Sequence, residues 1–554
     1  MMNEFIKYLN GLHNYYAQNQ NAYGERNISS PFYHKTMVSI DICDYIISLI
    51  KQEKPHIIIL TGHAGDGKTS IMYQVLESFG ADVTNLLSDQ EVILDNNKHI
   101  RCIKDFSELS DDNKLETLNT VLQCPSQGRY VFMVSNTGPL INTFGRLFSD
   151  EEQRENAKMA LIERLDTNDG KLEDLFGHKM CILNMAAIDN TNFSRNFLDK
   201  VLNDELWEPC NCCPKRDYCH IRNNHDLIIE NRERVYEFIE YYYIWQTEYG
   251  KRLTIRSMAE QLAYMVTGGD DCNDVEPSSM HEKIFANLFF GYEGIISNPL
   301  ADNIFAIRLA KESDLFLRRI RTDEELLIRR NYKQLFGKSV NKIIEGIDRP
   351  TTRSKEFDEE LRRLFFFMNI LTGEQHKKDL EDIFSKEFLP YVAVRNYGKK
   401  PSKTQKNLVI DALRMVYHGS VISENNMIPI TMGCEDGITQ SVQLIAGRLN
   451  SSDIELFEKK DSELNSNRKN IILRIKQKEI CKLSLPMLDH FEELKNGVIA
   501  TNMDPQLSHG IENLKSRLLE LADIDEDKLD FLIMKNDGFG EVSLEIEDGV
   551  IILQ

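Results

Sequence analysis

Long apolar runs are missing from this 554-residue sequence, and so is a recognisable secretory leader. No stretch approaches the roughly 20 consecutive apolar residues that a membrane-spanning helix needs. Residues 1–7 contain no apolar h-region of the kind that signal peptides carry. We therefore expect a cytoplasmic protein that has no membrane partner.

Positive charge is also scarce. Lys and Arg total 66 against 87 Asp and Glu, which gives a net charge of −21. A chain this acidic should not coat DNA non-specifically, so it would bind DNA through a local basic groove or through partner proteins. The sequence lacks a complete helix-turn-helix or C₂H₂ signature and a nuclease triad of the P-D…(D/E)-x-K type. We expect no nuclease activity in this chain and assign strand cleavage to a partner.

One run fits the pattern G-x-x-x-x-G-K-[ST] of a phosphate-binding loop. An apolar run over residues 56–60 precedes it and predicts a strand buried on both faces, and residues 70–77 have helical spacing. In such a loop the backbone N–H groups and the helix N-terminus cradle phosphates, the lysine reaches the β- and γ-phosphates, and the threonine ligates Mg²⁺. The alternative is a glycine-rich turn that binds nothing. The predicted ATP-binding residues are Gly62, His63, Ala64, Gly65, Asp66, Gly67, Lys68, Thr69 and Ser70.

Polar residues follow two further predicted strands, over residues 100–105 and 130–134. We assign Asp105 to hold Mg²⁺ together with Thr69, and Glu108 to polarise the attacking water. Asn136 fits the sensor 1 position of AAA-type ATPases, because ligands bind at the carboxyl ends of parallel strands. The alternatives are that Asp105 only caps the next element and that Asn136 belongs to an ordinary turn.

The alternation of strands and helices predicts the fold class and its domains. A further strand over 180–185, with helices over 113–122 and 151–165, predicts an α/β P-loop NTPase domain with a parallel sheet of the additional-strand, AAA-like type. A helical lid and a mostly α C-terminal region with a small terminal β cap follow. The predicted parts are an N-terminal helical segment (1–50), the ATPase core (51–205), a cysteine-rich metal-binding insert (206–225), the lid (226–300), a charged helical domain for DNA or partner binding (301–470) and an α+β cap (471–554).

The 11 cysteines do not form a disulfide framework, and several of them cluster. We predict a structural Zn²⁺ held by Cys210, Cys212, Cys213 and Cys219, with His220 as the alternative to Cys212. An iron–sulfur cluster is the alternative metal group, and unligated thiols are the alternative without metal. Cys181 or Cys272 could be brought to the site by the fold.

Two further groups of basic residues are candidates for binding roles. We expect Thr254 to be the N-cap of a lid helix that ends at Gly268. Arg256 lies in the first turn of this predicted helix and could reach the γ-phosphate as sensor 2. The alternative is that Arg256 is an ordinary surface arginine.

A predicted loop is the best local candidate for contacts to a DNA backbone, and the alternative is a solvated surface. The basic residues of this loop are Arg395, Lys399, Lys400, Lys403 and Lys406.

The chain resembles the DptF (DndF) family, the F component of DNA phosphorothioation-dependent restriction systems. The motifs that carry the resemblance are the loop 62–69, Ser135-Asn136-Thr137-Gly138, Cys210/Cys213/Cys219 with Asn223, and Leu253-Thr254-Ile255-Arg256. The resemblance implies an ATPase subunit of a bacterial antiviral complex, which attacks DNA lacking the host's phosphorothioate mark together with a helicase-like ATPase and another subunit.

The chain could also form a homo-oligomer. Two other functions stay open beside this one. The first is a nucleotide-dependent switch or scaffold with little turnover in another defence or signalling assembly. The absence of Glu directly after Asp105 and the acidic composition favour it. The second is a small-molecule kinase.

Overall fold

A computed structural model describes residues 3–15, 30–95, 97–277, 280–337, 344, 354–418, 426–432, 441–465, 467–498, 503–521, 528–535, 538–547 and 550–553. The chain divides into two compact units, Met1–His376 with Ser462–Asn465, and Lys377–Asp461 with Ser466–Gln554. This division falls inside the segment 301–470 that the sequence assigned to one domain. None of the helices in the described part of the chain has the length and apolar character needed to cross a membrane.

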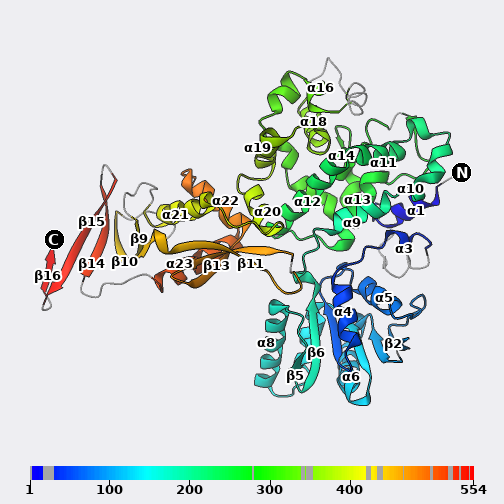
Figure 1. Cartoon of the computed structure of the whole chain (residues 1–554), viewed down its shortest axis with the longest axis horizontal. Coiled ribbons are helices and arrows are strands. Elements are labelled where there is room, and N and C mark those ends of the chain that lie inside the picture. The colour runs from blue at the N-terminus through cyan, green and yellow to red at the C-terminus, as the bar shows by residue number, and fades with distance from the viewer. Residues whose placement is uncertain are drawn as a thin grey trace. The chain divides into compact units, whose positions relative to one another are not determined.

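A six-stranded, mostly parallel sheet forms the α/β part of the first unit (Figure 1). Its strand order is β2-β3-β4-β1-β6-β5, in which β3, β4, β1 and β6 run parallel and the edge strands β2 and β5 run antiparallel to their neighbours. The predicted parallel sheet is confirmed for the four central strands, whereas both antiparallel edges were not predicted. The strands are β1 (Ile57–Thr61), β2 (Asp89–Ile93), β3 (His99–Ile103), β4 (Tyr130–Val134), β5 (Glu173–Leu175) and β6 (His178–Asn184).

Both faces of this sheet are covered by helices. Strand β1 is buried throughout, with Ile58 and Leu60 facing one core and Ile57 and Ile59 facing the other. This alternation follows from the two-residue period of a strand and explains why β1 is an uninterrupted apolar run. On the first face lie α4 (Ile42–Lys51) and α5 (Lys68–Glu77), and on the second lie α6 (Asp111–Gln123), α7 (Thr137–Gly145) and α8 (Glu151–Thr167).

Helices make up most of the rest of the first unit. The predicted lid helix is α13 (Ile255–Thr267), in which Thr254 Oγ1 accepts a hydrogen bond from Ser257 N at 3.2 Å and Gly268 ends the helix with φ +64°. The other elements are α1 (Glu4–Gly11), α3 (Tyr33–Thr36), α9 (Phe193–Val201), α10 (Asp204–Trp207), α11 (His220–Glu230), α12 (Arg232–Glu248), α14 (Phe285–Phe289), α15 (Phe305–Glu312), α16 (Tyr332–Leu335) and α18 (Lys355–Met368), with a short hairpin of β7 (Tyr292–Glu293) and β8 (Ile296–Ser297). The boundary between the two units falls within α19 (Gly373–Ile383).

The second unit contains more β structure than the sequence predicted. Antiparallel strands begin at Met427, inside the segment expected to be helical, and form sheets of order β16-β15-β14-β10-β9 and β11-β12-β13. Side chains of β10 alternate between buried and partly exposed positions, which is the pattern of a half-buried strand. The elements are α20 (Phe388–Arg395), α21 (Lys403–His418), β9 (Met427–Met432), β10 (Val442–Asn450), β11 (Ile454–Lys460), β12 (Lys469–Ile475), β13 (Lys478–Leu483), α22 (Leu485–Lys495), α23 (Pro505–Leu519), β14 (Lys528–Lys535), β15 (Gly538–Glu547) and β16 (Val550–Leu553).

Candidate nucleotide site

The loop between β1 and α5 curls tightly at the carboxyl end of β1. Its glycines Gly62, Gly65 and Gly67 have φ values of +146°, +90° and +78°, a region that residues with a Cβ atom rarely adopt. At Gly65 an added Cβ would lie 2.9 Å from Thr254 Oγ1. The loop therefore needs glycine both for its conformation and for its close approach to α13.

Lys68, the first residue of α5, is buried at this loop. Its ammonium donates to the carbonyl oxygens of Gly62 at 3.2 Å and His63 at 2.6 Å, and to Oδ1 of Asn136 at 3.1 Å. Burial lowers the pKa of Lys68 to about 8, with Asp66 opposing the shift and Arg256 adding to it. Thr69 and Ser70 follow in the first turn of α5, both half-buried. A lysine that is confined among oxygen acceptors suits recognition of an anionic ligand.

Asp66 joins the loop to the start of the lid. Its side chain is fully buried, accepts the N–H of His63 at 2.8 Å and pairs with Arg252 Nη1 at 2.9 Å. Arg252 also donates to the carbonyl of Met185, just beyond β6, at 2.8 Å. Three segments of the unit are thereby fixed to one another at the carboxyl edge of the sheet.

A second link joins the first turn of α13 to the loop. The backbone N–H of Arg256 donates to the carbonyl of Gly65 at 3.1 Å. One turn further along α13 lies Glu260, which is 5 % exposed, and burial raises its pKa to about 7 against the opposing charge of Arg256. The structure therefore brings the backbone of Arg256 to the loop, and its role as sensor 2 stays a prediction.

The predicted water- and Mg²⁺-binding residues follow β3 and β4. Asn136 meets Lys68, as described, and Ser107 Oγ accepts the backbone N–H of Asn136 at 2.6 Å. Asp105 is half-buried at the N-cap of the 3₁₀ turn that follows β3, whereas the Glu108 side chain is exposed. Lys68 and Asn136 thus meet directly, and Ser107 ties the segment with Asp105 to Asn136.

No known relative supplies a function. Neither a family model, nor a curated protein, nor a solved structure matches this chain. The assignment of function depends on the geometry of the site.

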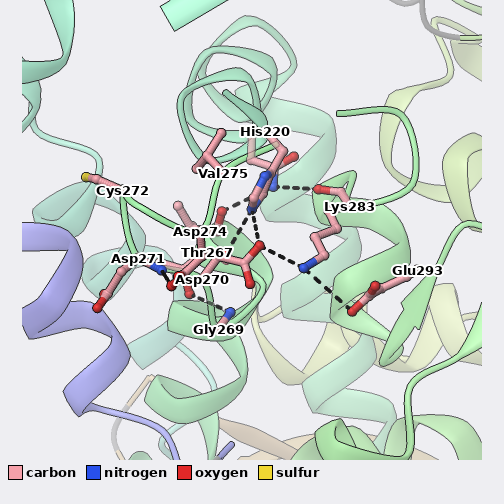
Figure 2. A network of polar contacts seen from close by, with 12 residues as sticks. His220, Thr267, Gly269, Asp270, Asp271, Cys272, Asp274, Val275, Lys283 and Glu293 are labelled. Carbon is pink, nitrogen blue, oxygen red and sulfur yellow. Dashed lines mark hydrogen bonds and ion pairs between the residues drawn. The ribbon is translucent and has the colours of Figure 1, made fainter. Parts of the chain in front are cut away.

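The cysteine cluster differs from the predicted ligand set in one member. The side chain of Cys212 is exposed, whereas Cys210, Cys213 and Cys219 line a small cavity together with Cys272. His220, the predicted alternative ligand, is fully buried with its Nε2 atom 3.1 Å from the carbonyl oxygen of Thr267 (Figure 2). Cys181 lies in the sheet, where its thiol donates to the carbonyl of Gly170.

The predicted DNA-contacting residues do not form one exposed set. Arg395 is buried at the end of α20, where it donates to Oδ1 of Asn396 at 2.7 Å. Lys399, Lys400 and Lys403 are exposed, and Lys406 is half-buried. The three exposed lysines alone remain as a basic surface in this segment.

Three residues of these sites carried no assigned role in the sequence analysis. They are Ser107, Arg252 and Lys215, and each acts through a contact with another segment. Asp66 points to a partner cation only once the structure shows that it is buried, because buried carboxylates are paired. Nothing in the sequence shows that the cation is Arg252.

Proposed function

We propose that this chain binds and hydrolyses ATP at the loop 62–69. The observation that carries the proposal is the convergence of Lys68 and Asn136 at the carboxyl ends of β1 and β4, beside the N-terminus of α5. The strand order supports it too, because β4 lies between the loop strand β1 and the strand β3 that precedes Asp105. This order is the one expected for the additional-strand type of ATPase, in which a strand is inserted between these two.

Each residue of the site has a role in this proposal. Lys68 would bind the β- and γ-phosphates, with the first N–H groups of α5 adding their partial positive charge. Thr69 and Asp105 would hold Mg²⁺, which neutralises phosphate charge and prefers such oxygen ligands. Asn136 would orient the attacking water, and Arg256 would stabilise the charge that develops on the γ-phosphate.

The resemblance to the DptF (DndF) family extends the proposal to a biological context. We infer a cytoplasmic ATPase subunit of an antiviral complex that restricts DNA lacking phosphorothioate. DNA would be engaged directly or through partner subunits, one of them helicase-like. The exposed Lys399, Lys400 and Lys403 are the residues of this chain that fit direct contact with phosphates.

The proposal is tested by ATP turnover, measured as phosphate release with and without unmodified DNA and the partner subunits. Lys68→Ala should abolish turnover. Lys54→Ala should leave turnover unchanged, because Lys54 is an exposed lysine that precedes β1, at the opposite end of that strand from the loop. Equal turnover in Lys68→Ala and in the wild type would refute ATP hydrolysis at this loop.

One observation favours the switch or scaffold as a second function. Glu108, the residue chosen to polarise water, is exposed, and the residue directly after Asp105 is the buried Phe106. A slow ATPase that changes partner affinity on binding ATP would fit this arrangement. Glu108→Gln distinguishes the two functions, because a motor loses turnover whereas a switch retains its ATP-dependent partner binding.

A further inference from the structure

Four cysteine thiols from distant parts of the first unit line one cavity. They belong to Cys210, Cys213, Cys219 and Cys272, and the volume of about 20 Å³ accommodates a single water molecule or metal ion. The sequence separates Cys272 from the other three by more than 50 residues. We propose that these four thiols, without Cys212, bind one structural Zn²⁺ ion.

Lys215 holds the segment with Cys272 against the segment with Cys213. Its ammonium donates to three carbonyl groups of one loop, those of Cys272 at 3.1 Å, Asn273 at 2.9 Å and Val275 at 3.1 Å. Lys215 lies two residues after Cys213. The position of Cys272 at the cavity is therefore fixed by contacts between the two segments.

A second set of contacts fixes the same loop from the side of Cys219. His220, the next residue, has its Nε2 atom 3.1 Å from the carbonyl oxygen of Thr267 and 3.4 Å from Oδ2 of Asp270. Asp270 in turn pairs with Lys283 at 2.7 Å. Figure 2 shows this network and the Cys272 side chain directed away from it. The network holds the loop in place and leaves the Cys272 thiol outside its polar contacts.

The surroundings of the cavity suit thiolates. Asn3 donates to Cys210 Sγ at 3.4 Å. Three cations line the same cavity and offset the negative charge of a tetrathiolate site: Lys215, Arg216 and Arg222.

Four cysteines are the ligand set of a tetrahedral structural zinc site. Among the described residues, no group of three His, Cys, Asp or Glu side chains is already gathered as metal ligands are. Binding therefore requires the four thiols to turn into the cavity that they line. Four cysteines can also hold an iron–sulfur cluster, which the metal analysis distinguishes by its iron and labile sulfide.

Zinc in this position would anchor the lid helix. The first turn of α13 contacts Gly65 in the loop, and Cys272 follows shortly after its C-terminal cap at Gly268. The ion would cross-link the end of α13 to residues 210–219. This metal site does not depend on the proposed ATPase activity, because its evidence lies in the cysteine cavity alone.

The test is the metal content of the purified full-length chain, measured by mass spectrometry for the wild type, Cys272→Ser and Cys212→Ser. We expect one zinc per chain in the wild type and in Cys212→Ser, and at least about a tenfold loss of zinc affinity in Cys272→Ser, since one of four ligands is removed. Wild type without zinc, or with iron and labile sulfide in its place, would overturn the proposal. So would full zinc in Cys272→Ser, or loss of zinc from Cys212→Ser.

A second measurement separates loss of a ligand from loss of the fold. Cobalt(II) in place of zinc reports the number of thiolate ligands through its visible absorption. Wild type and Cys212→Ser should give one common tetrathiolate spectrum, and Cys272→Ser a weaker and shifted one, with circular dichroism showing that the variants retain their helices. An unchanged cobalt spectrum in Cys272→Ser would refute the role of Cys272 whatever the metal content.

Discussion

Arg252 Nη1 lies 2.9 Å from Oδ1 of Asp66, a carboxylate that is completely buried within the phosphate-binding loop. The pair joins the loop to the segment that leads into α13. Removal of one partner from a buried ion pair leaves the other charge without compensation, which costs several kcal/mol.

Arg252→Ala should therefore lower the free energy of unfolding by about 2–4 kcal/mol. The measurement is urea denaturation. Arg329→Ala is the matched control, because Arg329 pairs with Glu324 on the surface, and such pairs contribute less than about 1 kcal/mol. Equal losses in the two variants would show that the Asp66 pair has no special role.

Gly65→Ala should impair nucleotide binding. Gly65 has φ +90°, and its Cβ would lie 2.9 Å from Thr254 Oγ1, so the loop must move away from α13. We expect affinity for MgATP to fall by about tenfold or more, equivalent to about 1.4 kcal/mol. The control is Gly128→Ala, with φ +78° but nothing within 4 Å of an added Cβ. The Gly128→Ala variant has backbone strain similar to that of Gly65→Ala, and its affinity for MgATP should equal that of the wild type.

The pKa of Lys68 predicts how nucleotide affinity depends on pH. Because burial lowers this pKa to about 8, the ammonium is fully charged well below pH 8 and loses its proton above it. Bound phosphate favours the charged form, so affinity should be constant up to about pH 7 and fall by up to about tenfold per pH unit above 8. Lys68→Arg keeps its charge throughout this range. Titration calorimetry at several pH values should show the fall in the wild type and not in the arginine variant.

The pKa of Glu260 predicts a different pH effect, on stability. Burial raises this pKa from 4.5 to about 7, so between these values the folded chain binds more protons than the unfolded chain. The free energy of unfolding must then fall as the pH rises through this window. Glu260→Gln removes the effect and should gain about 2 kcal/mol relative to the wild type between pH 5 and pH 8. Glu163→Gln, an exposed site on α8, should show no such trend.

Local patterns in the sequence were sufficient to predict the central strands of the α/β sheet. The apolar run before the loop became β1, and the run over residues 130–134 became β4 with the predicted bounds. Both strands are buried on two faces, so their composition alone separates them from helices and exposed strands. The edge strands β2 and β5 are partly exposed, and their sequences carry no comparable apolar run.

Contacts between distant segments could not be predicted in the same way. Asp66 and Arg252 are separated by 186 positions, and neither residue carries a local sign of the other. Cys272 lies outside the cysteine cluster, whereas Cys212 lies within it yet is exposed. In the second unit, strands such as β10 have one buried face and lie in the segment 301–470, which was predicted to be a charged helical domain.

Equilibrium binding of MgATP, measured by titration calorimetry on the full-length chain, tests the central claim most directly. The account predicts saturable binding of one MgATP per chain by the wild type and by Lys54→Ala, and at least about a tenfold weaker affinity in Lys68→Ala. No binding by the wild type, or equal affinities in the wild type and Lys68→Ala, would contradict it.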